Sequence, residues 1–271
     1  MNLTPWSRRV TRAIVGSAIL AAHLANPSPA LAIIGGSTSD PGTFPWANVG
    51  DYGVGSTVFL GDVNNNGTFW AITAYHNYEV VNTTVLFGST YNIVAGSEVR
   101  LTNTIPGFSE YTDLMMFRVD VNANPIGLTT ITLADTLPVT NNTLYMAGYG
   151  GGSKRWASNS AATSPGAYQV GSAFGDIAAF VTYQANGAQA EGGDSGGGVF
   201  HFNESESTWE LTGIMLGVGP VGGPYDRTYS ASIAAYRDQI FAAAIPEPGS
   251  MVLLAAGLAG VLWHGKRRRA A

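Results

Sequence analysis

The sequence predicts an all-β fold that ends in one short helix. Glycine accounts for 35 of the 271 residues, and charged residues make up only 11%. Short runs of β-branched and aromatic residues alternate with turn-forming residues, as in strands joined by tight loops. Many short strands of this kind are typical of barrels and sandwiches. The strand-rich runs lie at residues 55–75, 82–96, 113–121, 143–150 and 209–219.

Turns and the helix are recognised by composition. Asn66-Gly67 and Asn186-Gly187 are candidates for tight turns. Residues 231–244 combine helical spacing of apolar residues with good helix formers, so a helix is expected to close the fold.

Residues 1–32 have the pattern of a secretory signal peptide. Three arginines precede an apolar run, and small residues lead up to Ala32. The run is shorter than the ~20 apolar residues of a membrane-spanning helix. A cut after Ala32 would make Ile33 the first residue. A cut after Ala25 would instead leave a short propeptide, and the sequence leaves both open.

Residues 246–271 have the pattern of a second processing signal. Pro246, Glu247 and Pro248 precede a short apolar run, which is followed by the basic cluster 266–269. The segment resembles the PEP-CTERM sorting tails of Gram-negative bacteria, which an exosortase is thought to recognise and cleave. The apolar run spans only ~20 Å of the ~30 Å hydrocarbon core, so we expect transient membrane association, with a plain tail anchor as the alternative.

The body between these ends, residues 33–245, is acidic. Three of the 13 basic residues precede it and four follow it, so six remain against 17 acidic residues, a formal charge of −11. A nucleic-acid partner is not expected, because no basic stripe could neutralise phosphates. The chain has no cysteine, which excludes disulfides, cysteine-ligated zinc and a cysteine nucleophile.

Two features of this body suggest nucleophilic chemistry. Its only histidines are His76, where an apolar run ends, and His201, within a predicted strand. Ser195 lies in the segment EGGDSGGGVF, residues 191–200, among five glycines and beside an aspartate. Glycines around a nucleophile let backbone amides converge where an oxyanion forms, although a glycine-rich turn is also typical of an ordinary surface loop.

Three segments, TAYH, YTDLMMFRV and GDSGG, follow one another in the order His, Asp, Ser. They resemble the signatures of trypsin-like (chymotrypsin-fold) serine proteases, and this order differs from that of subtilisins and α/β-hydrolases. IIGG, DPGTFPWANVG, LYMAGYGG and AAYRDQI extend the resemblance over nearly all of residues 33–245. It implies two six-stranded antiparallel barrels, about 33–135 and 140–245, with the active site between them.

The resemblance also implies the site residues. His76, Asp113 and Ser195 would form the catalytic triad, with the amides of Gly193 and Ser195 as the oxyanion hole. Asp120 is a rival for the aspartate, but only Asp113 precedes the apolar strand as the family pattern requires. The implied activity is that of a serine endopeptidase acting on protein or peptide substrates, exported to the cell surface or beyond as a monomer, without metal or cofactor.

In this family a new N-terminal ammonium pairs with the aspartate before the nucleophile. The resemblance therefore pairs Ile33 with Asp194. A cut after Ala32 would let export itself produce this amine. Signal peptidase and an exosortase-type enzyme are the expected processing partners.

Some positions depart from the family pattern. Gln189 stands at the base of the implied specificity pocket, so a preference for Lys or Arg is not expected, and small or neutral side chains are favoured. Asn77 replaces a cysteine after the histidine, and residues 213–219 replace the usual substrate-aligning segment. Two other functions remain open: an inactive homologue that serves as a surface or matrix binding module, and a purely structural β-rich surface protein.

Overall fold

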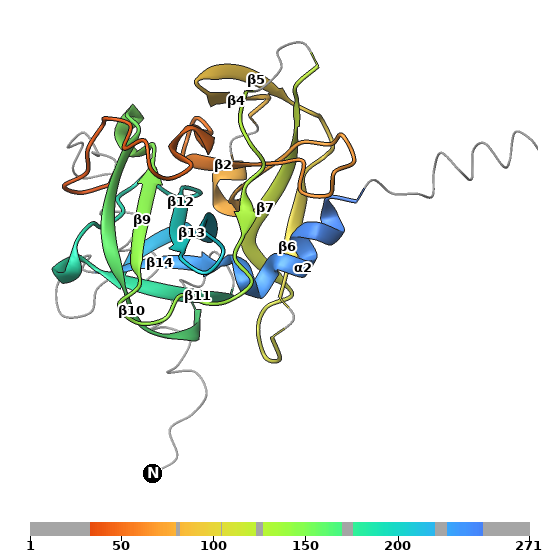
Figure 1. Ribbon diagram of the computed structural model, residues 1–271. Coiled ribbons are helices and arrows are strands. Elements are labelled where there is room, and N and C mark those ends of the chain that lie inside the picture. The colour runs from red at the N-terminus through yellow and green to blue at the C-terminus, as the bar shows by residue number, and fades with distance from the viewer. Residues whose placement is uncertain are drawn as a thin grey trace, which may run out of the picture.

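Two closed sheets make up the computed structural model, which describes residues 33–79, 82–103, 105–122, 127–169, 176–219 and 227–245 (Figure 1). The first sheet contains β1 (Val49–Asp51), β2 (Ser56–Gly61), β3 (Trp70–Ala74), β4 (Thr84–Phe87), β5 (Ser89–Ile93), β6 (Val99–Thr102) and β7 (Tyr111–Asp120). The second contains β8 (Thr132–Leu133), β9 (Thr143–Gly148), β10 (Arg155–Gln169), β11 (Asp176–Tyr183), β12 (Gly198–Asn203), β13 (Thr208–Gly219) and β14 (Arg227–Ser232).

Each sheet closes on itself through one additional strand pair. The first runs β3-β2-β1-β4-β5-β7, and pairing of β3 with β7 completes a six-stranded barrel to which β6 is added. The second runs β12-β9-β10-β11-β14-β13 and closes through β12 and β13, with β8 added in parallel to β13. The two-barrel fold expected from the resemblance is therefore confirmed. Short 3-10 helices η1 (Trp46–Asn48), η2 (Tyr75–Glu79), η3 (Gly150–Gly152) and η4 (Gln184–Asn186) lie between the strands.

The position of strand β7 between two apolar clusters explains why its sequence is apolar on both faces. Met115 and Phe117 pack in the core of the first barrel, whereas Leu114 and Met116 belong to a separate cluster between the barrels. Successive side chains of a strand point to opposite faces, so a strand buried on both faces has an unbroken apolar run.

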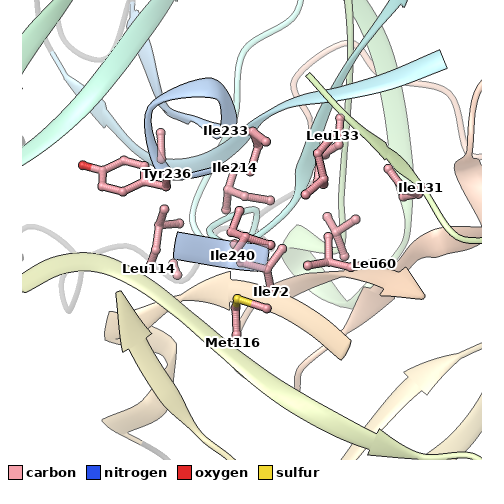
Figure 2. Close-up of a cluster of buried hydrophobic side chains, with 14 of the residues drawn as sticks. Leu60, Ile72, Leu114, Met116, Ile131, Leu133, Ile214, Ile233, Tyr236 and Ile240 are labelled. Carbon is pink, nitrogen blue, oxygen red and sulfur yellow. The ribbon is translucent and has the colours of Figure 1, made fainter. Parts of the chain in front are cut away.

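The cluster between the barrels joins strands of both sheets to the C-terminal helix α2 (Ile233–Ala243), as Figure 2 shows. Its labelled members are Leu60, Ile72, Leu114, Met116, Ile131, Leu133, Ile214, Ile233, Tyr236 and Ile240. All are at most 5% exposed. Burial of this apolar surface holds the two barrels in one relative position.

Helix α2 adds hydrogen bonds to this apolar contact. It follows the last strand of the second barrel but lies against β6 of the first (Figure 1). The Gln239 side chain accepts from the Thr102 amide at 2.9 Å and donates to the Thr102 carbonyl at 2.8 Å. At the end of the helix, the Asn64 side chain of the first barrel donates to the Phe241 carbonyl at 2.8 Å. The orphan carbonyls of a helix C-terminus thus find partners in the other barrel.

The Tyr236 hydroxyl bridges the two barrels, and we predict that it contributes measurably to stability. It accepts from the Ala178 amide of β11 at 2.9 Å and donates to the Asn103 side-chain carbonyl at 2.8 Å. Tyr236→Phe should lower the free energy of unfolding by about 1–3 kcal/mol, because both partners lose a partly buried hydrogen bond. Urea denaturation measures this loss. Tyr111→Phe, at a residue 45% exposed, is the control and should change it by less than ~0.5 kcal/mol. Equal effects of the two variants would contradict the prediction.

Candidate functional site

His76 and Asp113 lie together because their strands are paired. His76 is in η2, directly after β3, and Asp113 is the third residue of β7. The pairing of Ala74 with Leu114 brings the two residues side by side. His76 Nδ1 lies 2.7 Å from one Asp113 carboxylate oxygen, and the His76 amide donates to the other at 2.9 Å.

This contact determines the tautomer of the imidazole. The Asp113 side chain is only 3% exposed, against 18% for His76. An ionised carboxylate can only accept hydrogen bonds, so Nδ1 carries the proton and Nε2 of a neutral ring is left as an acceptor. The rival Asp120 lies at the far end of β7 and accepts from the amide and the side chain of Asn122 instead.

Ser195 belongs to the second barrel but is anchored to the first. Its carbonyl accepts from the Ser56 amide and from the Asn77 side chain, both at 2.8 Å. Asn77 directly follows His76 in the chain, so the same short segment carries the imidazole and holds the serine backbone. The Ser195 hydroxyl donates to the Leu216 carbonyl of β13 at 3.3 Å.

The role of Asn77 in holding the Ser195 backbone was not recognisable from the sequence. Asn77 is 3% exposed, and its amide also donates to the Thr73 hydroxyl at 3.0 Å. A Cβ on Gly55 would lie only 2.5 Å from the Asn77 side-chain nitrogen, so the asparagine needs a glycine at position 55. The only sequence signal was a polar residue after His76 in a cysteine-free chain.

The backbone around Gly193 leaves two amides available. Gly193 has a φ of +94°, a conformation that favours glycine, and its carbonyl accepts from the Ser56 hydroxyl at 3.0 Å. That contact orients the peptide between residues 193 and 194. Among the described residues, the amides of Gly193 and Ser195 have no acceptor, whereas those of Asp194, Gly196 and Gly197 all do. The arrangement suits an anionic oxygen that accepts from both free amides.

Asp194 is fully buried in the second barrel. Its carboxylate accepts from the amides of Ile33 at 2.8 Å, Glu191 at 2.9 Å and Gly150 at 2.9 Å. Desolvation raises the pKa of Asp194 to about 6, although the three amides act in the opposite direction. Gly148 makes room for the carboxylate, since a Cβ there would lie 2.3 Å from it.

Ile33 is fully buried in the core of the second barrel beside Asp194. The following residue, Ile34, donates its amide to the Gln189 carbonyl at 2.8 Å. Ile33 has a φ of +38°, which is unusual for a β-branched residue and costs on the order of 1–3 kcal/mol. The segment that begins at Ile33 is therefore bound tightly, but with a strained first residue.

Gln189, 1% exposed, lies on the segment that leads to Ser195. The next residue, Ala190, donates its amide to the Thr228 hydroxyl of β14 at 3.0 Å. The second histidine of the described residues, His201, lies on β12 with Nδ1 3.1 Å from the Thr143 carbonyl. Pro246, Glu247 and Pro248, like the segment 1–32, lie outside the described residues.

The described ranges contain neither a metal-binding cluster nor a membrane-spanning helix. No cluster of three or more His, Cys, Asp or Glu side chains there could hold a metal ion. In the same ranges, no helix has the length and apolar character needed to cross a membrane.

The raised pKa of Asp194 predicts how stability changes with pH while Ile33 is part of a peptide bond. Between pH 3.8 and about 6 the folded chain keeps a proton on Asp194 that the unfolded chain releases. The free energy of unfolding should therefore fall as pH rises through this window, by about 3 kcal/mol in all. Urea denaturation of the unprocessed chain at pH 4 and pH 7 measures the change. Asp194→Asn is the control, because it should remove this component of the pH dependence. An unchanged pH dependence in that variant would refute the assignment.

Comparison with known proteins agrees with this architecture. The trypsin-like peptidase domain family matches residues 55–214, and the PEP-CTERM protein-sorting motif matches residues 244–269. That motif indicates export and surface anchoring in Gram-negative bacteria. No curated protein matches the chain.

Two solved structures share the fold. Neuropsin, a serine protease expressed in the limbic system of mouse brain, is 19% identical with a TM-score of 0.54, over 76% of this chain and 97% of neuropsin. An inactive serine-to-alanine mutant of Rv3671c from Mycobacterium tuberculosis H37Rv is 13% identical with a TM-score of 0.51, over 75% of this chain and 90% of its own. With a family match over more than half of its length, this chain belongs to the trypsin-like peptidases and carries a PEP-CTERM protein-sorting motif.

Proposed function

We propose that the chain is an exported serine endopeptidase that hydrolyses peptide bonds through an acyl-enzyme. The observation that carries the proposal is the His76–Asp113 contact of 2.7 Å beside Asn77, whose side chain holds the Ser195 backbone. These contacts support a site in which a nucleophile from one barrel works with a base and the group that orients it from the other.

In the proposed mechanism the Ser195 hydroxyl attacks the scissile carbonyl carbon. His76 Nε2 takes the hydroxyl proton and passes it to the leaving amine, while Asp113 stabilises the charged imidazole. Water then attacks the acyl-enzyme by the same route, with His76 again as the base. The products are two peptides, and Ser195 is restored.

The proposed oxyanion hole consists of the amides of Gly193 and Ser195. Their lack of acceptors among the described residues supports this role. Losing one such donor typically costs about 3–4 kcal/mol of transition-state stabilisation. From the first barrel, the Ser56 hydroxyl binds the Gly193 carbonyl and so orients the peptide between residues 193 and 194, which lies between the two proposed amides.

The proposal includes a cut before Ile33. The new ammonium would occupy the position of the Ile33 nitrogen, 2.8 Å from Asp194, and give the buried carboxylate a counter-charge. The positive φ of Ile33 supports the same cut, because that torsion is imposed only while residue 32 is attached. Cleavage at this bond would both release strain and pair a buried charge.

A serine-directed fluorophosphonate tests the enzyme against the inactive homologue. The folded wild-type protein should be labelled, and Ser195→Ala should not, with kcat lowered about 10⁶-fold and the melting temperature nearly unchanged. Ser205→Ala, in the exposed turn between β12 and β13, is the matched control and should be labelled as the wild type is. A folded wild-type protein that stays unlabelled would overturn the proposal and favour the binding module.

A chain that begins at Ile33 should react faster than one with a single additional alanine before it. The ammonium pairs with Asp194 only in the first chain, and breaking such a buried pair typically costs about 3–5 kcal/mol. The rate of fluorophosphonate labelling compares the two chains, and mass spectrometry of each verifies its first residue. Equal labelling rates would show that the ammonium is not needed.

A further inference from the structure

Ser56, the first residue of β2, is buried where the first barrel meets two loops of the second. Its hydroxyl donates to the Gly193 carbonyl at 3.0 Å and accepts from the Tyr149 amide at 2.7 Å. Its own amide donates to the Ser195 carbonyl at 2.8 Å. A single residue of the first barrel therefore binds the backbone on both sides of Asp194 and the loop that begins at Tyr149.

The chemistry of its partners determines the direction of both hydrogen bonds of the Ser56 hydroxyl. A carbonyl oxygen can only accept and a backbone amide can only donate. The single hydroxyl proton therefore points to Gly193, and a lone pair points to Tyr149. Alanine at position 56 would deprive both groups of this partner at once.

The segment that Ser56 holds has little conformational preference of its own. Four glycines lie among residues 192–197, and Gly193 and Gly196 have φ values of +94° and +88°. Glycine loses more conformational freedom on ordering than any other residue. The peptide that follows Gly193 is nevertheless held at both ends, because its carbonyl accepts from Ser56 and its N–H donates to the Glu191 carbonyl at 3.1 Å. The two amides of the proposed oxyanion hole lie on either side of this peptide.

The loop that begins at Tyr149 is held from both barrels. The Ser56 hydroxyl binds the Tyr149 amide, and the Asp194 carboxylate binds the next amide, that of Gly150, at 2.9 Å. This loop packs directly against the nucleophile segment, since a Cβ on Gly193 would lie only 3.0 Å from the Gly150 Cα. Close packing thus transmits the restraint on the loop to Gly193.

These contacts of Ser56 do not involve the residue at which the proposed cut falls. The Ile33 nitrogen in this structure belongs to a peptide bond, and the backbone around Gly193 already has the geometry described above. Asp194 contributes to this order, but it receives only a dipole from the Ile33 amide and no ammonium charge. The contacts from the first barrel are complete without the cut.

We propose that Ser56 is a positioning residue whose hydroxyl holds the proposed oxyanion hole in shape before the cut at Ile33. This inference rests on the proposed peptidase function and adds a form of regulation to it. The unprocessed chain has a formed hole and reacts slowly, and the ammonium strengthens an order that Ser56 has already imposed. Ser56 acts through Gly193 and Tyr149, so its loss should affect the transition state, in which the oxyanion is bound, more than the ground state.

Ser56→Ala, compared with Thr57→Val, tests the positioning role in the chain that begins at Ile33. Both variants remove one buried hydroxyl from β2, but that of Thr57 donates to the Ile72 carbonyl within the first barrel, at 2.9 Å. Ser56→Ala should lower the limiting rate of fluorophosphonate labelling about 10- to 100-fold and leave the half-saturating concentration nearly unchanged. Thr57→Val should label as the wild type does. Ser56→Cys, which keeps a weak donor, should be intermediate.

Circular dichroism verifies that each variant is folded under the labelling conditions. Equal losses of rate in Ser56→Ala and Thr57→Val would show that the Ser56 hydroxyl only stabilises the fold, and would overturn its positioning role.

The chain with one additional alanine before Ile33 tests when Ser56 acts. This unprocessed form should be labelled slowly but measurably, and Ser56→Ala should lower its rate by a further 10- to 100-fold, because the hydrogen bonds of Ser56 do not need the ammonium. An unprocessed chain that is not labelled at all, while the processed chain is, would overturn the proposal. A labelling rate that does not respond to Ser56→Ala would do so as well.

Hydrogen exchange of the unprocessed chain separates this proposal from catalysis. Ser56→Ala should raise the exchange rate of the amides of residues 191–197 about tenfold, and Thr57→Val should not. Unchanged exchange in Ser56→Ala would overturn the role of Ser56 and leave the peptidase function intact. A wild-type protein that stays unlabelled, although Ser56→Ala raises the exchange rate, would overturn only the peptidase function.

Discussion

The apolar interface between the barrels is the constraint on which the candidate site depends. His76 and Asp113 are positioned by the first barrel, whereas Ser195 and Asp194 belong to the second. Neither barrel alone contains all four of these side chains. Fully burying one large aliphatic side chain contributes about 1.5–3 kcal/mol, so a cluster of this size strongly favours the docked arrangement. Helix α2 reinforces it by leaving one barrel and binding the other.

A second constraint is the buried charge next to the nucleophile. The Asp194 carboxylate accepts three backbone amides, yet its pKa is still raised, so hydrogen bonds alone do not offset its desolvation. Because burying the charged Asp194 carboxylate is costly, its stability depends on which kind of nitrogen lies beside it. An amide of Ile33 supplies a dipole, whereas a terminal ammonium at the same place would supply a full charge.

The fold class and the closing helix were predictable from local patterns, because the strand-rich runs and the helix are continuous in the chain. Strand β10 was not predictable in this way, because Pro165 and Gly166 within it are typical of a turn. The strand accommodates these residues through a register shift between Ala162 and Gly166. The motifs around His76, Asp113 and Ser195 were recognisable as sequence. Their relative positions were not, because the contacts join residues distant in the chain: His76 meets Asp113 across 37 positions, and Asn77 meets Ser195 across 118.

Asn77 illustrates this limit of local sequence patterns. Its amide meets the Ser195 carbonyl across 118 positions, and nothing in either segment alone specifies that meeting. A single position at the base of the expected pocket, Gln189, was the only local indicator of specificity.

The polar contact of Asn77 has a consequence for where and when the site can form. A connection between the barrels that consists of hydrogen bonds and packed apolar groups forms as fast as the chain folds. Unlike a disulfide, it needs no oxidant, no disulfide isomerase and no particular thiol–disulfide redox potential in the compartment. Assembly of the site is thereby uncoupled from the redox chemistry of the envelope, and reductants released by neighbouring cells would leave its geometry untouched.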